Sequence, residues 1–315
     1  MKKRQLGRSD LQVAPLAFGG NVFGWTIDES TSFQLLDNFT AAGFNLVDTA
    51  DVYSRWVPGN KGGESETIIG KWMRQRGNRD KVIVATKGGA DMGQGKKDLS
   101  KKYIGKAVED SLQRLQTDYI DLYQTHWDDD TTPVEETLDV YARLIKEGKV
   151  RWIGASNLTP ARLTASLEAS AKNGYPRYES FQPGYNLYDR EGFEKELEPI
   201  CLEHQMGVIS YFSLASGFLS GKYRSESDLS KSVRGGGVKK YLDERGLRIL
   251  TALDTVAAQY KTNPASVALA WLIARSSITA PIASATNPEQ LVDLIKAAEL
   301  SLDAAAIELL DKASA

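Results

Sequence analysis

The segment "VIVATK", residues 82–87, is short, rich in β-branched and apolar residues, and ends in a lysine. Similar runs recur along the chain at 15–20, 45–50, 120–126, 150–156, 179–185, 207–212 and 280–284. Most of them are continuously apolar rather than alternating, which is typical of parallel strands covered on both faces. Longer amphipathic segments separate the runs. We therefore expect strands and helices to alternate from end to end.

The spacing of these runs predicts the fold. Successive strand candidates lie about 30 residues apart, which is the size of a βαβ repeat. Eight such units in a chain of 315 residues favour an α/β protein built as one (β/α)8 barrel domain over residues 1–315. A doubly wound sheet is the alternative, but no G-x-G-x-x-G motif follows any strand candidate. The opening "RQLGRSDLQVAPL", residues 4–16, predicts a hairpin ahead of the first barrel strand.

Helix and loop boundaries can be predicted at several places. The segment 30–43 carries Ser and Thr ahead of its apolar positions and ends in Gly43, and the segment 132–149 has Thr132 before Pro133 and stops at Gly148. Three connections, 54–64, 90–100 and 222–240, are longer than ordinary loops. We expect them at the C-terminal face of the barrel, where barrel enzymes build their active sites.

Composition narrows the class of protein. A net charge of −2 disfavours nucleic acid or an anionic membrane as the main partner, because both require a basic surface. The single cysteine, Cys201, excludes an internal disulfide and suits a reducing cytoplasm. The two histidines, His126 and His204, lack the spacing of a zinc site. No apolar run is long enough to span a membrane. We expect a soluble, cytoplasmic protein that binds small molecules.

Four ionisable residues fall at or just after consecutive strand candidates. Asp48 lies near the end of 45–50 and Tyr53 follows it, whereas Lys87 ends 82–87 and His126 ends 120–126. Each residue alone has an ordinary structural explanation, such as a cap, a packed ring or a solvated charge. Because the carboxyl ends of barrel strands meet at one mouth, the four together predict an active site there.

This group of residues suits proton transfer to a carbonyl oxygen. A free tyrosine has a pKa near ~10, and we expect the ammonium of Lys87 to lower that of Tyr53, with Asp48 holding the ammonium in place. Such a phenol can protonate an oxygen that is becoming an alkoxide, as in carbonyl reduction by a nicotinamide cofactor. A rival interpretation makes Lys87 the Schiff-base nucleophile of an aldolase-type barrel, but the adjacent Asp and Tyr disfavour it.

The chain resembles the aldo-keto reductases over essentially all of its length. The resemblance rests on "DTADVY" (48–53), "GGESETIIGKW" (62–72), "GKVRWIGASN" (148–157) and the lysine and histidine already described. It implies an NAD(P)H-dependent reductase of aldehydes or ketones, with alcohol oxidation possible in reverse. Tyr53 would be the general acid/base, Lys87 and Asp48 would tune it, and His126 would orient the substrate. Some relatives are attached to potassium channels, so a cofactor-sensing regulatory or docking subunit is the alternative function.

The resemblance also implies where the cofactor binds. Positions that match the carboxamide and ring contacts follow strands five, six and seven, and they are Ser156, Asn157, Gln182 and Tyr211. Positions that match the pyrophosphate contacts lie in "SLASGFLSGK", and they are Ser213, Leu214, Ser216 and Lys222. The basic stretch "RGGGVKK" after it is interpreted either as a flap over the cofactor phosphates, with Arg234 as a phosphate contact, or as a solvated loop. Gly20 and Asn21, after the first strand, are assigned to the same ligand.

The last part of the cofactor site decides the choice between two nucleotides. Ser284, Thr286 and Gln290 lie at the start of a helix, which is a natural seat for the 2′-phosphate of NADP(H). Thr286 stands where many relatives carry an arginine, so the sequence predicts NADP(H) over NAD(H) by a modest factor only. The substrate is not named by the sequence. Three loop tryptophans, Trp25, Trp56 and Trp127, are expected to line its pocket, with plain packing as the alternative.

Overall fold

A computed structural model describes residues 2–315, and eight strands within that range form one parallel sheet. These strands are β3 (Ala17–Gly19), β4 (Leu46–Asp48), β5 (Ile83–Gly88), β6 (Ile120–Thr125), β7 (Val150–Ser156), β8 (Ser180–Gln182), β9 (Gly207–Val208) and β10 (Ile282–Ala283). Each lies within, or overlaps by all but one residue, one of the eight apolar runs in the sequence. The predicted strand number and order are therefore confirmed.

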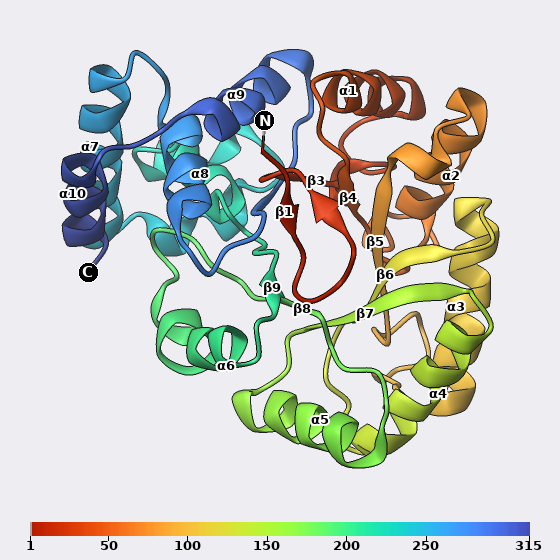
Figure 1. The fold of residues 1–315 in the computed structure, drawn as a ribbon. Helices are drawn as coiled ribbons and strands as arrows, with labels where there is room; N and C mark the ends of the chain where they lie inside the picture. Colours follow the sequence, from red (N-terminus) through yellow and green to blue (C-terminus); the bar gives the residue numbers. More distant parts are fainter. Residues whose placement is uncertain (1) are drawn as a thin grey trace.

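The sheet curls into a closed barrel. Its order is β10-β3-β4-β5-β6-β7-β8-β9, with every neighbouring pair parallel. The two ends of this order meet, because the amide of Thr279 donates to the carbonyl of Val208 at 2.8 Å and the amide of Ile282 donates to the carbonyl of Ser210 at 2.8 Å. Figure 1 shows the strands in the centre and the helices around them. The predicted (β/α)8 barrel is confirmed.

Helices alternate with the strands around the outside of the barrel. They are α1 (Glu29–Ala41), α2 (Glu64–Arg76), α3 (Lys101–Leu115), α4 (Val134–Lys146), α5 (Pro160–Asn173), α6 (Glu198–Glu203), α7 (Glu244–Gln259), α8 (Pro264–Ala274), α9 (Pro288–Glu299) and α10 (Ala304–Ser314). Two predicted starts differ in detail. Asp28 caps α1, since its carboxylate accepts from the amide of Thr31, and the hydroxyl of Thr132 bonds to Asp129 instead of capping α4.

The N-terminal hairpin closes the lower end of the barrel. Strands β1 (Arg4–Gln5) and β2 (Gln12–Val13) pair antiparallel, as predicted. Between them Leu6 and Leu11 are buried in the same apolar cluster as Leu122, which points into the barrel. The guanidinium of Arg4 donates to the carbonyls of Ile278 and Ile273 at 2.9 Å each. In Figure 1 the hairpin lies in front of the strands, so this view looks onto the N-terminal face.

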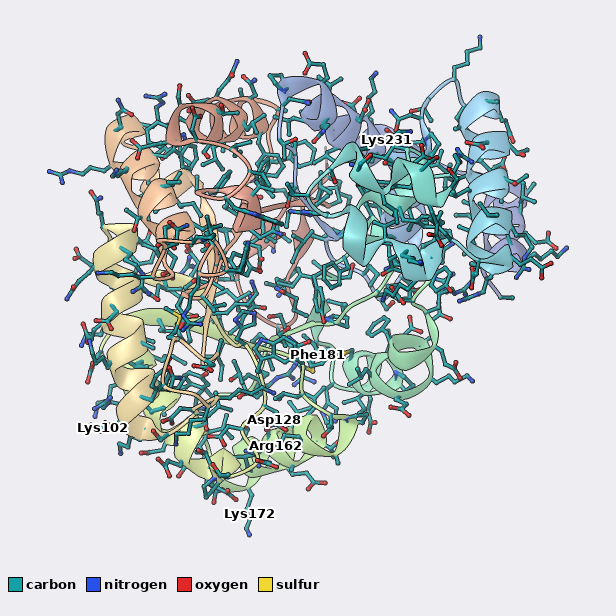
Figure 2. All side chains as sticks on the ribbon, turned by 180° about the vertical axis from the view of Figure 1, so that it is seen from behind. Lys102, Asp128, Arg162, Lys172, Phe181 and Lys231 are labelled. Carbon is teal, nitrogen blue, oxygen red and sulfur yellow. The ribbon has the colours of Figure 1, made fainter. Side chains whose placement is uncertain are left out.

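The connections at the opposite face are the long ones. Residues 49–63 lead from β4 to α2, and residues 89–100 lead from β5 to α3. The path from β9 to α7 is interrupted by the short turns η4 (Ala215–Ser220), η5 (Glu226–Lys231), η6 (Gly235–Gly237) and η7 (Lys239–Tyr241). Figure 2, seen from behind, shows the part of this path that carries Lys231 on the near side of the molecule. No helix within residues 2–315 combines the length and apolarity needed to cross a membrane.

Candidate active site

Lys87 is at the centre of the site. It ends β5, its side chain is fully buried, and its Nζ lies 2.8 Å from Asp48 Oδ2, 2.9 Å from the Tyr53 hydroxyl and 2.8 Å from the carbonyl of Thr49. An ammonium has three donors, and these contacts use all three. A neutral amine has only two N–H donors, so its lone pair would have to face one of these three oxygens, which is unfavourable toward a carboxylate or a carbonyl. The contacts therefore fit a charged Lys87, although burial lowers its pKa and the Asp48 carboxylate opposes that shift.

Local backbone hydrogen bonds bring Tyr53 to this lysine. Asp48 ends β4, which pairs in register with β5. The amide of Asp51 then donates to the carbonyl of Lys87 at 3.1 Å, which ties the loop to the end of β5. A turn follows, in which the amide of Tyr53 donates to the carbonyl of Ala50 at 3.3 Å. The turn returns the phenol to the strand end that it has just left.

The proton of Tyr53 is held more tightly than the sequence predicts. Burial raises the pKa of Tyr53 well above its usual value, and the carboxylate of Asp48, which accepts a hydrogen bond from the phenol at 3.3 Å, raises it further. The expected lowering by Lys87 does not dominate, because the burial and the carboxylate outweigh the ammonium. The arrangement favours a phenol that keeps its proton until a basic oxygen reaches it.

His126 completes the predicted group of four. It follows β6, its amide donates to the carbonyl of Gly88 at 2.9 Å, and its ring centroid is 6.1 Å from that of Tyr53. Burial, followed by the charge of Lys87, lowers the pKa of His126 well below its usual value. The imidazole is therefore neutral at pH 7. Its buried Nδ1 has no hydrogen-bond partner within residues 2–315.

The residues predicted to contact the carboxamide form one hydrogen-bonded network that joins the predicted catalytic group. The Nε2 of Gln182 donates to Asp48 Oδ1 at 2.9 Å, and the hydroxyl of Ser156 donates to the carbonyl of Gln182 at 2.8 Å. Asn157 donates to the Ser156 hydroxyl at 3.0 Å and accepts from the Tyr211 hydroxyl at 2.8 Å. These amide and hydroxyl groups are oriented by one another at the ends of β7 and β8.

The turn after β9 has the backbone shape of an anion site. Leu214 is close to the right-handed helical region, whereas Ala215, Ser216 and Gly217 have φ of 47°, 57° and 94°. Successive amides in such a right-to-left sequence can line an anion-binding concavity. Here the amides of Ala215 and Gly217 already donate to the carbonyls of Phe212 and Leu214 at 2.7 Å and 2.8 Å, so these two are not free for a ligand. Lys222 lies against this turn, since a Cβ on Gly217 would be 3.2 Å from its Cε, and within residues 2–315 it forms no ion pair.

Arg234 reaches across the mouth from the same connection. Its guanidinium carbon lies 5.0 Å from the ring centroid of Trp25, Trp25 meets Trp56 edge-on at 5.4 Å, and Trp56 lies 6.1 Å from the Tyr53 ring. The Nη2 of Arg234 is buried without a hydrogen-bond partner among residues 2–315. Trp56 and Trp127 are 48% and 39% exposed, so neither is a core residue. The tryptophans form aromatic walls beside the catalytic group.

Two hydrogen-bonded pairs of residues form the predicted 2′-phosphate site after β10. The hydroxyl of Ser284 donates to Asn21 Oδ1 at 2.8 Å, which links the ends of β10 and β3. At the start of α9 the Oε1 of Gln290 accepts from the amide of Thr286 at 2.9 Å and from its hydroxyl at 3.1 Å. The side-chain oxygen of Gln290 thus accepts from the same two donors, the amide and the hydroxyl of Thr286, that a bound anion would use.

Two other predicted residues offer no free side chain. The hydroxyl of Ser213 is buried and donates to the carbonyl of Ser210 at 3.2 Å. A Cβ on Gly20 would lie 2.8 Å from the Ser65 hydroxyl and 3.0 Å from the carbonyl of Asp48. Any ligand contact at these two positions would have to come from the backbone.

Comparison with known proteins agrees with this geometry. Residues 15–315 match the sequence pattern of the aldo/keto reductase family. The chain belongs to the aldo/keto reductase family. Its members are oxidoreductases that act on small carbonyl compounds and typically use a nicotinamide cofactor.

Individual relatives align along nearly the whole chain. The "Uncharacterized oxidoreductase YrpG" of Bacillus subtilis is 35% identical over 99% of this chain and 95% of its own. The "Norsolorinic acid reductase" of Aspergillus flavus is 34% identical over 96% of this chain and 78% of its own. A "Probable voltage-gated potassium channel subunit beta" of Oryza sativa subsp. japonica is 32% identical over 95% and 92%.

The sequence prediction missed a buried acidic cluster behind the predicted catalytic group of this aldo/keto reductase. Asp51 is 2% exposed and Glu66 is fully buried. Glu66 accepts from the hydroxyl of Thr86 at 2.6 Å and from the Nε of Arg114 at 2.6 Å. The available signal was the second acid in "DTADVY", which follows directly after the buried strand candidate 45–50.

The sequence also did not predict how firmly the loop after β6 is held by hydrogen bonds and an ion pair. Arg162, on α5, donates through Nε to Asp128 Oδ1 at 2.9 Å, and the two side chains lie close together in Figure 2. The carboxylate of Asp129 accepts from the Thr132 hydroxyl at 2.6 Å and from the amide of Leu99 at 3.1 Å. Burial pushes the pKa of Asp129 upward, but these donors hold it below its usual range. The loop that carries Trp127 is thus fixed at both acids.

Proposed function

We propose that this protein reduces an aldehyde or ketone to the alcohol, taking hydride from a bound nicotinamide cofactor and a proton from Tyr53. One observation carries the proposal: the Tyr53 hydroxyl lies 2.9 Å from a buried, fully engaged Lys87 ammonium. An ion pair of this kind beside a phenol supports proton transfer. It does not suit a Schiff-base nucleophile, which must expose a neutral amine.

Each residue of the group has one role in the proposed reaction. When bound, the cofactor supplies the hydride, which no side chain can carry. Tyr53 donates its proton to the carbonyl oxygen, and Lys87 stabilises the phenolate that remains. Asp48 holds the ammonium of Lys87 in place. The neutral imidazole of His126 donates a hydrogen bond that orients the carbonyl. The reverse alcohol oxidation is possible and would require Tyr53 without its proton, a form that its raised pKa disfavours.

The residues present fit a nicotinamide dinucleotide. Ser156, Asn157 and Gln182 offer amide and hydroxyl groups for the carboxamide, and Tyr211 offers a ring face. The turn at 214–217, with Leu214 and Ser216, and the cations Lys222 and Arg234 would hold the pyrophosphate, and the unpartnered Nη2 of Arg234 supports this assignment. Gly20 and Asn21 border the same ligand. Ser284, Thr286 and Gln290 would hold a 2′-phosphate, so we infer a preference for NADP(H), with NAD(H) possible.

The test of the proposed acid is Tyr53→Phe. The variant keeps the ring but lacks the proton donor, and losing a general acid typically costs about 10²–10⁴-fold in turnover. Oxidation of reduced cofactor is followed by absorbance with a panel of aldehydes, ketones and sugars, and cofactor binding is measured separately by fluorescence. Tyr175→Phe is the matched control, since within residues 2–315 its hydroxyl makes no hydrogen bond. Unchanged reduction by Tyr53→Phe would refute the assignment.

A second function is favoured by one comparison. The similarity to a protein named as a probable potassium channel subunit beta favours a cofactor-sensing subunit with little turnover as the alternative. The same absorbance assay separates the two functions. Cofactor binding without reduction of any carbonyl in the panel would favour the sensing subunit.

A further inference from the structure

Asp51 lies directly behind the catalytic lysine, yet the proposed reaction does not use it. Its amide donates to the carbonyl of Lys87 at 3.1 Å, so its backbone position is coupled to the end of β5. Its side chain is 2% exposed, and its Oδ1 is buried with no hydrogen-bond partner among residues 2–315. A carboxylate left without partners at such a position would be costly.

The charges around Asp51 do not balance if it is ionised. Lys87 pairs with Asp48 at 2.8 Å, and Arg114 pairs with Glu66 at 2.6 Å. Both nearby cations are therefore already matched by a carboxylate. Asp51 is the third acid of this buried group, and within residues 2–315 no basic side chain forms an ion pair with it. A buried acid without a cation is expected to be neutral.

A second polar atom without a partner faces the same place. The hydroxyl of Tyr123, on β6, is buried and has no hydrogen-bond partner in the described residues 2–315. A Cβ on Gly88 would lie 2.0 Å from this hydroxyl and 3.3 Å from Asp51 Oδ2. The two groups therefore share the space beside Gly88. Glycine at this position leaves that space to polar atoms.

The titratable groups around Asp51 come from every element packed against it. They are Tyr53 on its own loop, Glu66 on α2, Lys87 on β5, Tyr103 and Arg114 on α3, and Tyr123 on β6. Two of them, Tyr53 and Lys87, belong to the proposed catalytic group. A change of charge on Asp51 must therefore alter the proton affinity of both.

We propose that Asp51 is a positioning residue that stays protonated in the active enzyme and suppresses carbonyl reduction when it ionises at alkaline pH. This inference rests on the proposed function. The neutral acid leaves Lys87 balanced by Asp48 alone. The ionised acid adds a second negative charge beside Lys87, which makes the Tyr53 proton harder to remove and the phenol a weaker donor.

Asp51 is expected to ionise at a pH at which the activity can be assayed. Burial, followed by the negative charge of Glu66, raises the pKa of Asp51 to about 8. The reductase activity of the wild-type protein should therefore decline as the pH rises through that value. The decline should appear in kcat, whereas the KM for the carbonyl should change little, since the side chain of Asp51 is only 2% exposed and is not open to a substrate.

Two variants should move this decline in opposite directions. Asp51→Asn keeps the shape but cannot ionise, so its alkaline decline should shift upward by at least about one pH unit. Glu66→Gln keeps the hydrogen bond from Thr86 but removes the like charge, so the decline should shift to lower pH. A decline that is the same in the wild-type protein and Asp51→Asn would overturn the proposal. Asp91→Asn, at an exposed acid on the loop after β5, is the matched control and should shift nothing.

A stability measurement tests the protonation without any turnover. The pKa of Asp51 is raised in the folded state, so between about pH 4 and pH 8 the native chain holds a proton that the unfolded chain has released. Stability must therefore fall as pH rises through that window. The urea midpoint of the wild-type protein should fall relative to that of Asp51→Asn between pH 5 and pH 8. Parallel midpoints would refute a protonated Asp51. If the midpoints diverge but no carbonyl is reduced, the proposed function fails and the protonation of Asp51 stands.

Discussion

Tyr53 and His126 face the same site, and burial keeps both side chains uncharged. Burial raises the pKa of Tyr53 and lowers that of His126, because burial disfavours the charged form of either group. The phenol therefore keeps its proton and the imidazole does not acquire one. Both groups are neutral hydrogen-bond donors around a buried ion pair, which is a suitable environment for an uncharged carbonyl that becomes an alkoxide.

The state of His126 can be measured directly. Because its pKa is well below the usual value, its NMR ring signals should show no titration near pH 6.5 in the native protein. The unfolded chain takes up a proton on this histidine below about pH 6.5, so the native state should lose up to about 1.4 kcal/mol of stability for each pH unit below that value. His126→Gln should lose this part of the acid dependence. A His126 signal that titrates near pH 6.5 in the native protein would contradict the assignment.

The proposed catalytic residues could be located from the sequence because the fold places them. Parallel strand ends meet at one mouth, so a strand end in the sequence is already a location in space, and Asp48, Lys87 and His126 were found in this way. Asp51 was not, because its environment depends on side chains from α2 and α3. Burial depends on such long-range packing, and a sequence pattern carries no information on which acid is left without a cation. The pKa of Tyr53 was mispredicted for the same reason.

At the scale of elements, the connection from β6 to α4 is a rigid support for the mouth. Arg162 donates to Asp128 at 2.9 Å and to the carbonyl of Asp129 at 3.0 Å, so α5 holds this loop in place. The ring of His126 stacks on that of Trp127, with centroids 6.0 Å apart. A disturbance of the loop would therefore be transmitted to the imidazole.

Asp129→Ala tests this support. The change removes the acceptor of the Thr132 hydroxyl and of the Leu99 amide, which are 2.6 Å and 3.1 Å away. The loss of hydrogen bonds to a charged, buried group should lower the free energy of unfolding by about 1.5–3 kcal/mol at pH 7, as measured by urea denaturation. The pKa of Asp129 is depressed in the folded state, so the difference should shrink as the pH falls below about 4. Asp130→Ala, at an exposed neighbour, should cost little. Equal effects of the two changes would show that the loop does not depend on Asp129.

Element boundaries were less predictable than element order. Asp28 caps α1 ahead of the Ser and Thr residues that the sequence favoured, because a carboxylate one turn from Thr31 can take the free amide. Residues 222–240 carry η5 and η6, although they read as a loop. Short turns of this kind depend on local hydrogen bonds, such as the pair between Ser225 and Asp228, rather than on apolar periodicity.

At the scale of the whole molecule, the proposed cofactor contacts follow the order of the strands. The carboxamide contacts end β7 and β8, the concave turn follows β9, and the seat at the start of α9 follows β10. In the sheet these strands are consecutive neighbours, with β9 joined to β10 by the hydrogen bonds that close the barrel. These three groups of residues follow one another along the rim in the same order as the carboxamide, the pyrophosphate and the 2′-phosphate of a dinucleotide.

The last seat decides how strongly NADPH is preferred over NADH. A 2′-phosphate there would be bound by the start of α9, worth roughly 0.3–1 kcal/mol, and by hydrogen bonds to a charged group, worth about 1.5–3 kcal/mol. Part of this binding free energy is offset, because a bound phosphate must replace the two hydrogen bonds that Gln290 accepts from the amide and hydroxyl of Thr286. We therefore expect NADPH to bind more tightly than NADH by about tenfold, which corresponds to roughly 1.4 kcal/mol.

Substitution at Thr286 tests this seat. Thr286→Arg should widen the gap between the two cofactors, because a guanidinium can bind a phosphate with two parallel hydrogen bonds. Thr286→Val should narrow the gap, since it keeps the shape of the side chain and removes the hydroxyl. Both cofactors would be titrated by quenching of the fluorescence of the 6 tryptophans, with NADH as the internal control. NADH affinity should be nearly the same in all three proteins, because NADH has no 2′-phosphate. Tighter binding of NADH than of NADPH by the unmodified protein would show that the phosphate does not bind at the start of α9.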